Sequence, residues 1–514
     1  MNRARALSLL IVAGALGAEN LWWEHVKFLA DDRLEGRNAG SEGYREAARY
    51  VAEQYRKLGL KVQVQEVPLV SRTIDEARSS IELVGADGRA RRLKLGEEAM
   101  FSTRTALAPE LDAPLVFVGY GLHVPDYGHD DLAGLDLKGK VAVYLSGAPS
   151  SVPGAVQAHA SGALARGEAF RRAGVIGAVS ISNPKNSDTP WERTAAARLQ
   201  ASMAIRDASL DTSNLMRFSA GVNPAHAEML FAASGHSFRG LLEAADAGKA
   251  LPRFPLKLAL RARAAMKEAT LTSENVIGIL EGADAKLRGE YLVLSAHLDH
   301  IGVNPNLKGD QIHNGAMDNA SGVATLIEVA RSMAGKRPRR SVLFAAVTAE
   351  EKGLLGSRYL ANRPVVQGPV VANLNFDMFL PIHKMEYVMA LGREESTLRE
   401  PLERAAAKVG VKVQPDLEPL RNRFIRSDQY NFILRGVPAL AMKVGYGKGS
   451  PEEEIQKRWL RERYHAPGDD LAQPVDLEAA ATFNALVTAL SLDVANAGER
   501  PRWNEGSFFR RFAR

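Results

Sequence analysis

Hydrophobic residues recur in short runs through the C-terminal half of the chain, and amphipathic stretches separate several of these runs. The runs are "NVIGIL", "YLVLSAH", "SVLFAAVTAEE", "VVANLNFDM" and "VPALAMKV"; such runs of Val, Leu and Ala are typical of buried parallel strands. "SGVATLIEVARSMAG" and "LREPLERAAAKVG" repeat apolar positions every three to four residues, which predicts helices. The alternation predicts an α/β fold in three layers, with a mixed, mostly parallel central sheet flanked by helices.

An amphipathic segment near the N-terminus, "GSEGYREAARYVAEQYRKLGL", has the same helical spacing. Ala47, Val51 and Tyr55 lie four positions apart, so they would share one face of a helix. Ser41 is a suitable N-cap residue, and Gly59 is a suitable stop. We therefore expect one long helix here.

A block of different character runs from about 70 to 262. "APLVFVGYG" and "GKVAVYLSG" are short β runs, and "GALARGEAFRRAGVIGAVSIS" is a predicted helix followed by a strand. The "GYG" turn, the "LDLKGKVAVYL" strand and "AGVIGAVSI" resemble the protease-associated domain, a small β-rich lid inserted in some exopeptidases. The resemblance implies that 19–69 and 263–500 form one catalytic domain, that 70–262 is an insertion, and that 501–514 is a tail.

The first residues, "MNRARALSLLIVAGALGAEN", place Arg3 and Arg5 before an apolar run that ends in small residues. This order is typical of a secretory signal peptide, here 1–18, and predicts an exported protein in the periplasm or outside the cell. The apolar run is short for a bilayer span. An uncleaved anchor is therefore the weaker alternative, and we expect no stable membrane insertion.

Composition narrows the functional classes. A chain of 514 residues can form two or more cores. The net charge of +6 is spread along the chain, and no basic run interleaves with aromatic residues, so we expect no nucleic-acid partner. The sequence contains no cysteine, which excludes disulfides, thiolate metal sites and a thiol nucleophile.

Metal-binding side chains follow the predicted strands at their C-terminal ends, where α/β sheets place their ligand sites. They are His297 and Asp299 in "LVLSAHLDH", Asp318 in "IHNGAMDNASG", Glu350 and Glu351 in "VLFAAVTAEEKG", Asp377 in "VVANLNFDM", and Tyr464 and His465 in "RERYHAPGDDL". Each motif alone has an ordinary explanation as a turn, a loop or a helix N-terminus. Together, two histidines and three carboxylates predict a site for two divalent metals with nitrogen and oxygen ligands.

Such a site requires carboxylates in different roles. Two zinc ions about 3.5–4 Å apart need a carboxylate between them, and they lower the pKa of a shared water to about 7. A further carboxylate that binds neither metal can accept that water's proton. Adjacent Glu350 and Glu351 suit this division. Asp299 is expected to accept the second imidazole N–H of His297 and orient the ring, and His300 is left as a structural residue or one at the rim.

The motifs "AHLD", "DNASG", "AEEKGLLGS", "NFDM" and "YH" resemble, in order and spacing, the zinc-dependent exopeptidases with two co-catalytic metals, the family of bacterial secreted aminopeptidases and glutamate carboxypeptidase II. The resemblance covers about 275 to 496, with the "GRNAGSEGYREAARYV" helix as its N-terminal piece. It implies two Zn²⁺ ions, one on His297 and Asp377 and one on Glu351 and His465, with Asp318 bridging. It also implies that Glu350 is the general base, that Tyr464 stabilises the oxyanion, and that Asp318 precedes a cis peptide bond.

The leading interpretation is a secreted aminopeptidase acting on peptides. A carboxypeptidase or dipeptidase is the alternative, since Arg421, Arg423 and Arg426 in "RNRFIRSDQYNF" could bind a carboxylate. Arg426 also resembles an arginine near the site of secreted aminopeptidases, so it is a candidate substrate-binding residue under both interpretations. A single-zinc glutaminyl cyclase and a non-catalytic receptor are less favoured, because all five ligands and Glu350 are present.

Overall fold

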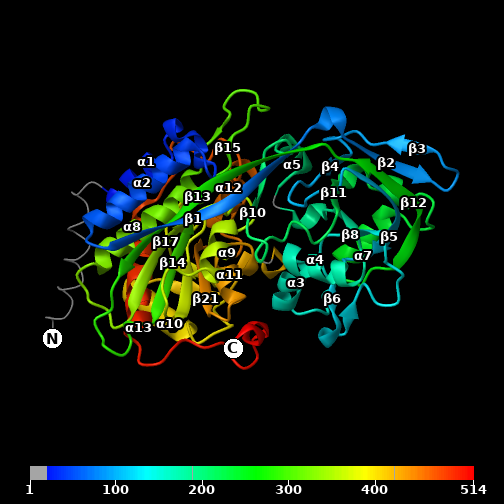
Figure 1. Ribbon diagram of the computed structural model, residues 1–514. Coiled ribbons are helices and arrows are strands. Elements are labelled where there is room, and N and C mark those ends of the chain that lie inside the picture. The colour runs from blue at the N-terminus through cyan, green and yellow to red at the C-terminus, as the bar shows by residue number, and fades with distance from the viewer. Residues whose placement is uncertain (1–19, 188, 422, 514) are drawn as a thin grey trace.

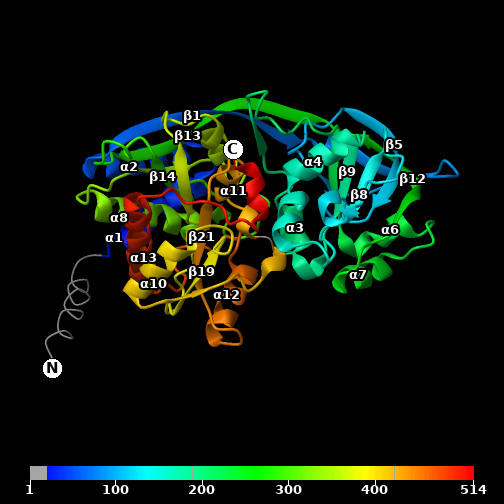
Figure 2. The same cartoon turned by 90° about the horizontal axis from the view of Figure 1, so that it is seen from below.

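The computed structural model describes residues 20–513 except 188 and 422, so the expected signal peptide lies outside the described residues. The described chain forms two lobes side by side, seen in Figure 1 and from below in Figure 2. Residues 75–265 leave the first lobe after β1, form the second lobe and return at β13, while β10 (Ser202–Ile205) within this span pairs with β1 in the sheet of the first lobe. These two long strands pair with each other along their whole length and link the lobes.

The first lobe is organised around a nine-stranded sheet. Its spatial order is β10 (Ser202–Ile205), β1 (Lys61–Ile74), β13 (Met266–Leu280), β17 (Ser341–Val347), β14 (Tyr291–His297), β18 (Val370–Asn375), β21 (Ala439–Gly445), β19 (Tyr387–Leu391) and β20 (Lys412–Gln414). The central strands β17, β14, β18 and β21 are parallel, whereas β1, β10 and β13 pair antiparallel at one edge and β19 pairs antiparallel with β21. The predicted mixed sheet with a mostly parallel core is confirmed.

Helices cover both faces of this sheet, which explains why its strands are hydrophobic throughout. Leu292 and Leu294 of β14 pack in one core with α1 (Leu21–Leu29), α2 (Glu42–Lys57), α8 (Ser321–Met333), α10 (Arg399–Val409) and α13 (Leu477–Asn496). Val293, between them, points to the other face, towards α9 (Leu355–Asn362) and α11 (Gln429–Ile433). Successive side chains of a strand thus enter two different cores.

The two longest apolar or amphipathic helices behave as core elements. In α2 the Ser41 hydroxyl caps the Tyr44 N–H, and Gly59 ends the turn after the helix with φ 76°, as the sequence predicted. Helix α13 has the length and composition of a membrane span. Its Phe483, Leu486 and Leu490 are buried in the first lobe's core, so it is a core helix here.

The second lobe has its own eight-stranded sheet and a core that also includes Ile425, Tyr430 and Ile433 of the first lobe. Its strands are, in spatial order, β3 (Ala90–Arg92), β2 (Ser80–Gly85), β12 (Arg253–Arg263), β5 (Glu110–Val118), β8 (Val141–Leu145), β9 (Gly177–Ile181), β11 (Phe218–Val222) and β4 (Ala99–Phe101). Its helices are α3 (Gly154–Ser161), α4 (Ala163–Arg172), α5 (Trp191–Ala196), α6 (Glu228–Phe231) and α7 (Phe238–Asp246). The C-terminal residues Trp503, Phe508 and Phe509 pack into this core as well.

Two short strand pairs and one further α-helix remain to be named among the described residues. They are β6 (His123–Val124) with β7 (His129–Asp130), β15 (Gly302–Val303) with β16 (Ile312–His313), and α12 (Pro451–Glu462).

Candidate metal centre

The predicted metal ligands meet at the carboxyl ends of the central parallel strands. His297 ends β14, Glu351 follows β17 and Asp377 follows β18. Asp318 lies just before α8, and His465 lies in the turn after α12. Residues from five separate segments are therefore brought to one edge of the sheet.

The ligand atoms form two groups that share Asp318. His297 Nε2 lies 3.2 Å from Asp318 Oδ1 and 3.5 Å from Asp377 Oδ1. On the other side, His465 Nε2 lies 3.4 Å from Asp318 Oδ2 and 3.2 Å from Glu351 Oε2. One carboxylate thus faces both groups, which is the geometry that a bridging ligand requires.

The electrostatics show that this cluster suits cations. Burial disfavours a charged imidazole, but the carboxylates of Glu350, Asp318 and Asp377 outweigh it and raise the pKa of His297 well above its usual value. For His465, Glu351 and Asp318 likewise outweigh burial and raise the pKa to about 10. Each ring nitrogen therefore lies where a positive charge is strongly favoured.

The donor set fits two zinc ions. His297, Asp318 and Asp377 hold their ligand atoms within 4.8 Å of one another, and so do His300, Asp318 and Glu351. Glu351 Oε1 is buried 2.8 Å from His300 Nδ1, and Glu351 Oε2 lies 3.2 Å from His465 Nε2. Buried carboxylate oxygens beside imidazole nitrogens are a donor set that zinc prefers.

His300 lies inside the centre and not at its rim, which corrects one of the two expectations for it. Its side chain is fully buried, and Nδ1 is 2.8 Å from Glu351 Oε1. The ring fits because Gly315 has no side chain: a Cβ there would lie 2.6 Å from the His300 ring. Its position three residues after His297 was the available signal in the sequence.

Asp299 acts on a different partner from the expected one. His297 Nδ1 donates to the backbone carbonyl of Asp299 at 3.0 Å, not to its carboxylate. The carboxylate instead accepts the backbone N–H groups of Glu350 at 3.0 Å and Glu351 at 3.3 Å. The peptide turns at Ala349, with φ 53°, and this turn presents both N–H groups to Asp299. Asp299 therefore fixes the segment of the two glutamates.

Glu350 and Tyr464 border the centre beside a pocket of about 80 Å³ that Asp318 and Asp377 also line. Burial, with Asp377 and Glu351 nearby, raises the pKa of Glu350 well above its usual value. Burial likewise raises the pKa of the Tyr464 hydroxyl well above its usual value, and its ring centroid is 3.9 Å from that of His465. Glu350 is thus a buried carboxyl with raised proton affinity, and Tyr464 is a protonated donor.

The three arginines of the predicted carboxylate-binding loop differ in position. Arg423 and Arg426 line the 80 Å³ pocket, and Arg421 is not among its lining residues. Arg421 and Arg423 both pair with Glu418. The side chain of Arg423 is only 16% exposed.

Two supporting residues were not identified from the sequence. Asp469 accepts the backbone N–H groups of Met317 and Asp318 at 2.9 Å each, and so fixes the segment that carries the shared carboxylate. Arg37 donates to the carbonyls of Asn314 at 2.7 Å and Gly315 at 3.1 Å on the same segment. The expected cis peptide bond between Asp318 and Asn319 is present.

Comparison with known proteins agrees with this arrangement. Residues 275–491 match the model of peptidase family M28. Aminopeptidase YwaD of Bacillus subtilis (strain 168) is 25% identical over 489 residues, 91% of this chain and 83% of its own. Probable leucine aminopeptidase 2 of Aspergillus fumigatus is 28% identical over 215 residues, 39% of this chain and 40% of its own. Among solved structures, the aminopeptidase of Aneurinibacillus sp. strain AM-1 shares the fold, with TM-score 0.54, 20% identity, and coverage of 95% of this chain and 94% of that one.

Proposed function

Since residues 275–491 belong to peptidase family M28, we propose that this chain is an exported aminopeptidase that uses two zinc ions to remove the N-terminal residue from peptides. The observation that carries the proposal is the pair of ligand groups sharing Asp318, with Glu350 beside them. Similarity to an aminopeptidase along 91% of the chain supports the same activity.

The ligand assignment follows from the distances. His297 and Asp377 would hold one zinc ion, Glu351 and His465 the other, and Asp318 both. When bound, the ions supply an activated water and polarise the carbonyl of the bond to be cleaved. The family's two-metal chemistry and the nitrogen and oxygen donors of this site support zinc.

The remaining groups act on protons and charge. Glu350 would accept the proton of the attacking water and pass it to the leaving amine, since its carboxylate lines the pocket without belonging to either ligand group. Tyr464, whose hydroxyl stays protonated, would donate to the developing oxyanion. Asp299 would act indirectly by holding the backbone of Glu350.

The pocket beside Glu350 would accept the side chain of the first residue. Its walls combine apolar Met378, Leu391 and Leu460 with the cations Arg426 and Lys443. With Asp318 and Asp377 bound to zinc, the other charged side chains in the wall would be one acid, Glu350, and three cations, Arg423, Arg426 and Lys443. We infer a preference for an acidic first residue, which Lys443 would bind through its ammonium.

The proposal also assigns roles to the second lobe and to the N-terminal segment. The second lobe corresponds to the insertion expected at 70–262. It would be a protease-associated lid on the catalytic domain formed by 19–69 and 263–500. Its own sheet supports this reading. The sequence pattern of 1–18 supports export to the periplasm or beyond the cell, without membrane insertion.

One assay separates the main candidates. Aminoacyl chromogenic amides and N-blocked dipeptides should be compared, each with and without a chelator. An aminopeptidase cleaves the free-amine amides and stops with the chelator. Cleavage of the blocked dipeptides alone would indicate a carboxypeptidase with Arg426 as its carboxylate ligand, and metal analysis should give about two zinc ions per chain.

A further inference from the structure

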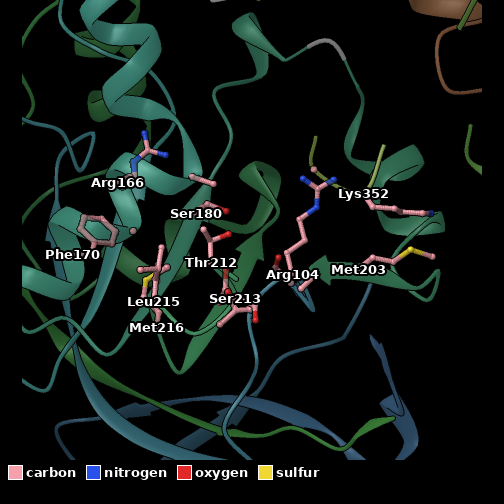
Figure 3. Close-up of a pocket in the computed structure, with 18 of the residues that line it drawn as sticks. Arg104, Arg166, Phe170, Ser180, Met203, Thr212, Ser213, Leu215, Met216 and Lys352 are labelled. Carbon is pink, nitrogen blue, oxygen red and sulfur yellow. The ribbon is translucent and has the colours of Figure 1, made fainter. Parts of the chain in front are cut away.

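A second cavity, of about 320 Å³, lies between the two lobes and away from the ligand groups. Figure 3 shows Arg166 and Phe170 on one side, Lys352 on the other, and Arg104 between them. Arg104 and Arg166 belong to the second lobe, whereas Lys352 and Arg358 come from the first. Cationic side chains thus converge from both lobes, and the described lining includes no Asp or Glu. We call this space the cationic cavity.

The four cations lack carboxylate partners. None forms an ion pair with a described Asp or Glu side chain. Arg104 donates to the backbone carbonyl of Glu351 at 3.1 Å, and Arg358 to the Thr212 hydroxyl at 3.0 Å. Lys352 is only 8% exposed, and it interacts electrostatically with Asp299 and Glu351 without forming an ion pair with either.

Arg166 is the least satisfied of the four. Its Nε is buried without a hydrogen-bond partner among the described residues, and its guanidinium lies 4.3 Å from the ring centroid of Tyr144. The Ser213 hydroxyl, also in the wall, is buried and unpartnered too. A buried donor atom without a partner is costly, and an anionic ligand that accepts from Arg166 Nε or the Ser213 hydroxyl would relieve that cost.

The cavity continues into the cleft that leads to the metal centre. That cleft, of about 800 Å³, is lined by Glu351 and His465. It shares Ser102, Arg104 and Lys352 with the cationic cavity. A peptide with its first residue at the metal centre therefore has a continuous path towards the cations.

We propose that the cationic cavity binds the C-terminal carboxylate of a short peptide whose N-terminal residue lies at the metal centre. The inference rests on the proposed aminopeptidase function. Charge-assisted hydrogen bonds from Arg104 and Arg166, one to each carboxylate oxygen, would supply the recognition. The enzyme would then favour short peptides with a free C-terminus over the same peptides with a C-terminal amide.

The kinetic test compares the tripeptide Leu-Gly-Gly as acid and as amide. In the wild-type enzyme the acid should have a kcat/KM about 10- to 150-fold higher, the range for hydrogen bonds to charged groups. Arg166→Gln should reduce the difference by raising KM for the acid, with kcat unchanged, because one of the two hydrogen bonds to the carboxylate is lost. The matched control is Arg171→Gln on the same helix, an exposed residue outside the cavity wall, which should keep the preference.

A binding test separates this inference from the proposed function. The Glu350→Gln chain, loaded with zinc, is titrated calorimetrically with both forms of the peptide, so that no turnover is needed. Tighter binding of the acid that weakens on adding Arg166→Gln supports the cavity even if no peptide is cleaved. Equal affinity for acid and amide, or equal loss in the Arg171→Gln control, overturns it.

Discussion

Arg193 of the second lobe donates a hydrogen bond from Nη1 to the backbone carbonyl of Tyr464 at 2.6 Å, next to the expected zinc ligand His465. Its Nη2 donates to the carbonyl of Arg461 at 2.8 Å. Arg104 of the same lobe donates to the carbonyl of Glu351. The second lobe thus contributes none of the five expected ligands but holds the backbone of one of them, Glu351, and of Tyr464, the residue before His465.

We therefore expect Arg193→Gln to weaken the zinc site that contains His465. Loss of two hydrogen bonds from a charged donor should free the turn, and supporting residues of a metal site typically change metal affinity about 10- to 100-fold. Zinc content after dialysis against a weak chelator measures this. Arg239→Gln, an exposed residue on α7 of the same lobe, is the control. Equal zinc retention in both variants would show that the turn does not need Arg193.

Glu350→Gln should keep both zinc ions and lose most turnover. The substitution removes the proton acceptor and leaves the five ligands in place, and general base catalysis contributes about 10²- to 10⁴-fold. The measurement is kcat for an aminoacyl amide together with zinc content. If the variant binds both zinc ions and keeps a near-normal kcat, Glu350 is not the general base.

Asp318→Ala should lose zinc and activity together. Asp318 faces both ligand groups, so without it two cations would lack their shared counter-charge. Zinc content and activity are compared with those of Glu350→Gln, which changes a neighbouring carboxylate outside the ligand set. Retention of two zinc ions by Asp318→Ala would contradict the bridging role.

The sequence was informative where strand pattern and motif coincide. His297 and Asp377 stand at the ends of apolar runs, and parallel strands bring such ends together. The partner of Asp299 was not predictable, because it depends on the positive φ of Ala349, which no periodicity reveals. The contacts of Arg104 and Arg193 join residues 247 and 271 positions apart, and only the packing of the two lobes creates them.

The contact between the lobes should weaken in acid. His159 Nδ1, on α3, lies 2.7 Å from the Tyr430 hydroxyl of α11, and burial together with Arg511 lowers the pKa of His159 from 6.5 to about 4. Between these values the unfolded chain binds the proton more readily than the folded one. Stability from this residue is therefore present above pH 6.5 and lost as pH falls towards 4, by at most about 1.4 kcal/mol per pH unit.

Thermal unfolding as a function of pH tests this. His159→Gln should show a shallower fall in Tm between pH 6.5 and 4 than the wild type, while the two Tm values should run parallel above pH 7. Identical slopes through the acid range would mean that His159 is not protonated on unfolding there.

Lys443→Met should change the choice of first residue. Lys443 lines the 80 Å³ pocket from β21, and its ammonium has no hydrogen bond or ion pair among the described residues. Burial lowers its pKa, which Asp377 opposes. A glutamate or aspartate side chain of the substrate would supply the missing partner, and hydrogen bonds to charged groups contribute about 1.5–3 kcal/mol, or roughly 10- to 150-fold.

The measurement is kcat/KM for glutamyl and leucyl chromogenic amides. The wild type should prefer the glutamyl amide, and Lys443→Met should reverse that order, because the glutamyl amide loses its cation while Met378, Leu391 and the new methionine favour the leucyl side chain. Lys448→Met removes an exposed lysine five residues further on and should leave the preference unchanged. If the wild-type enzyme instead prefers the leucyl amide, the apolar walls of the pocket determine its selectivity. The positive charge of Lys443 would then stabilise the Asp377 carboxylate and would not bind substrate.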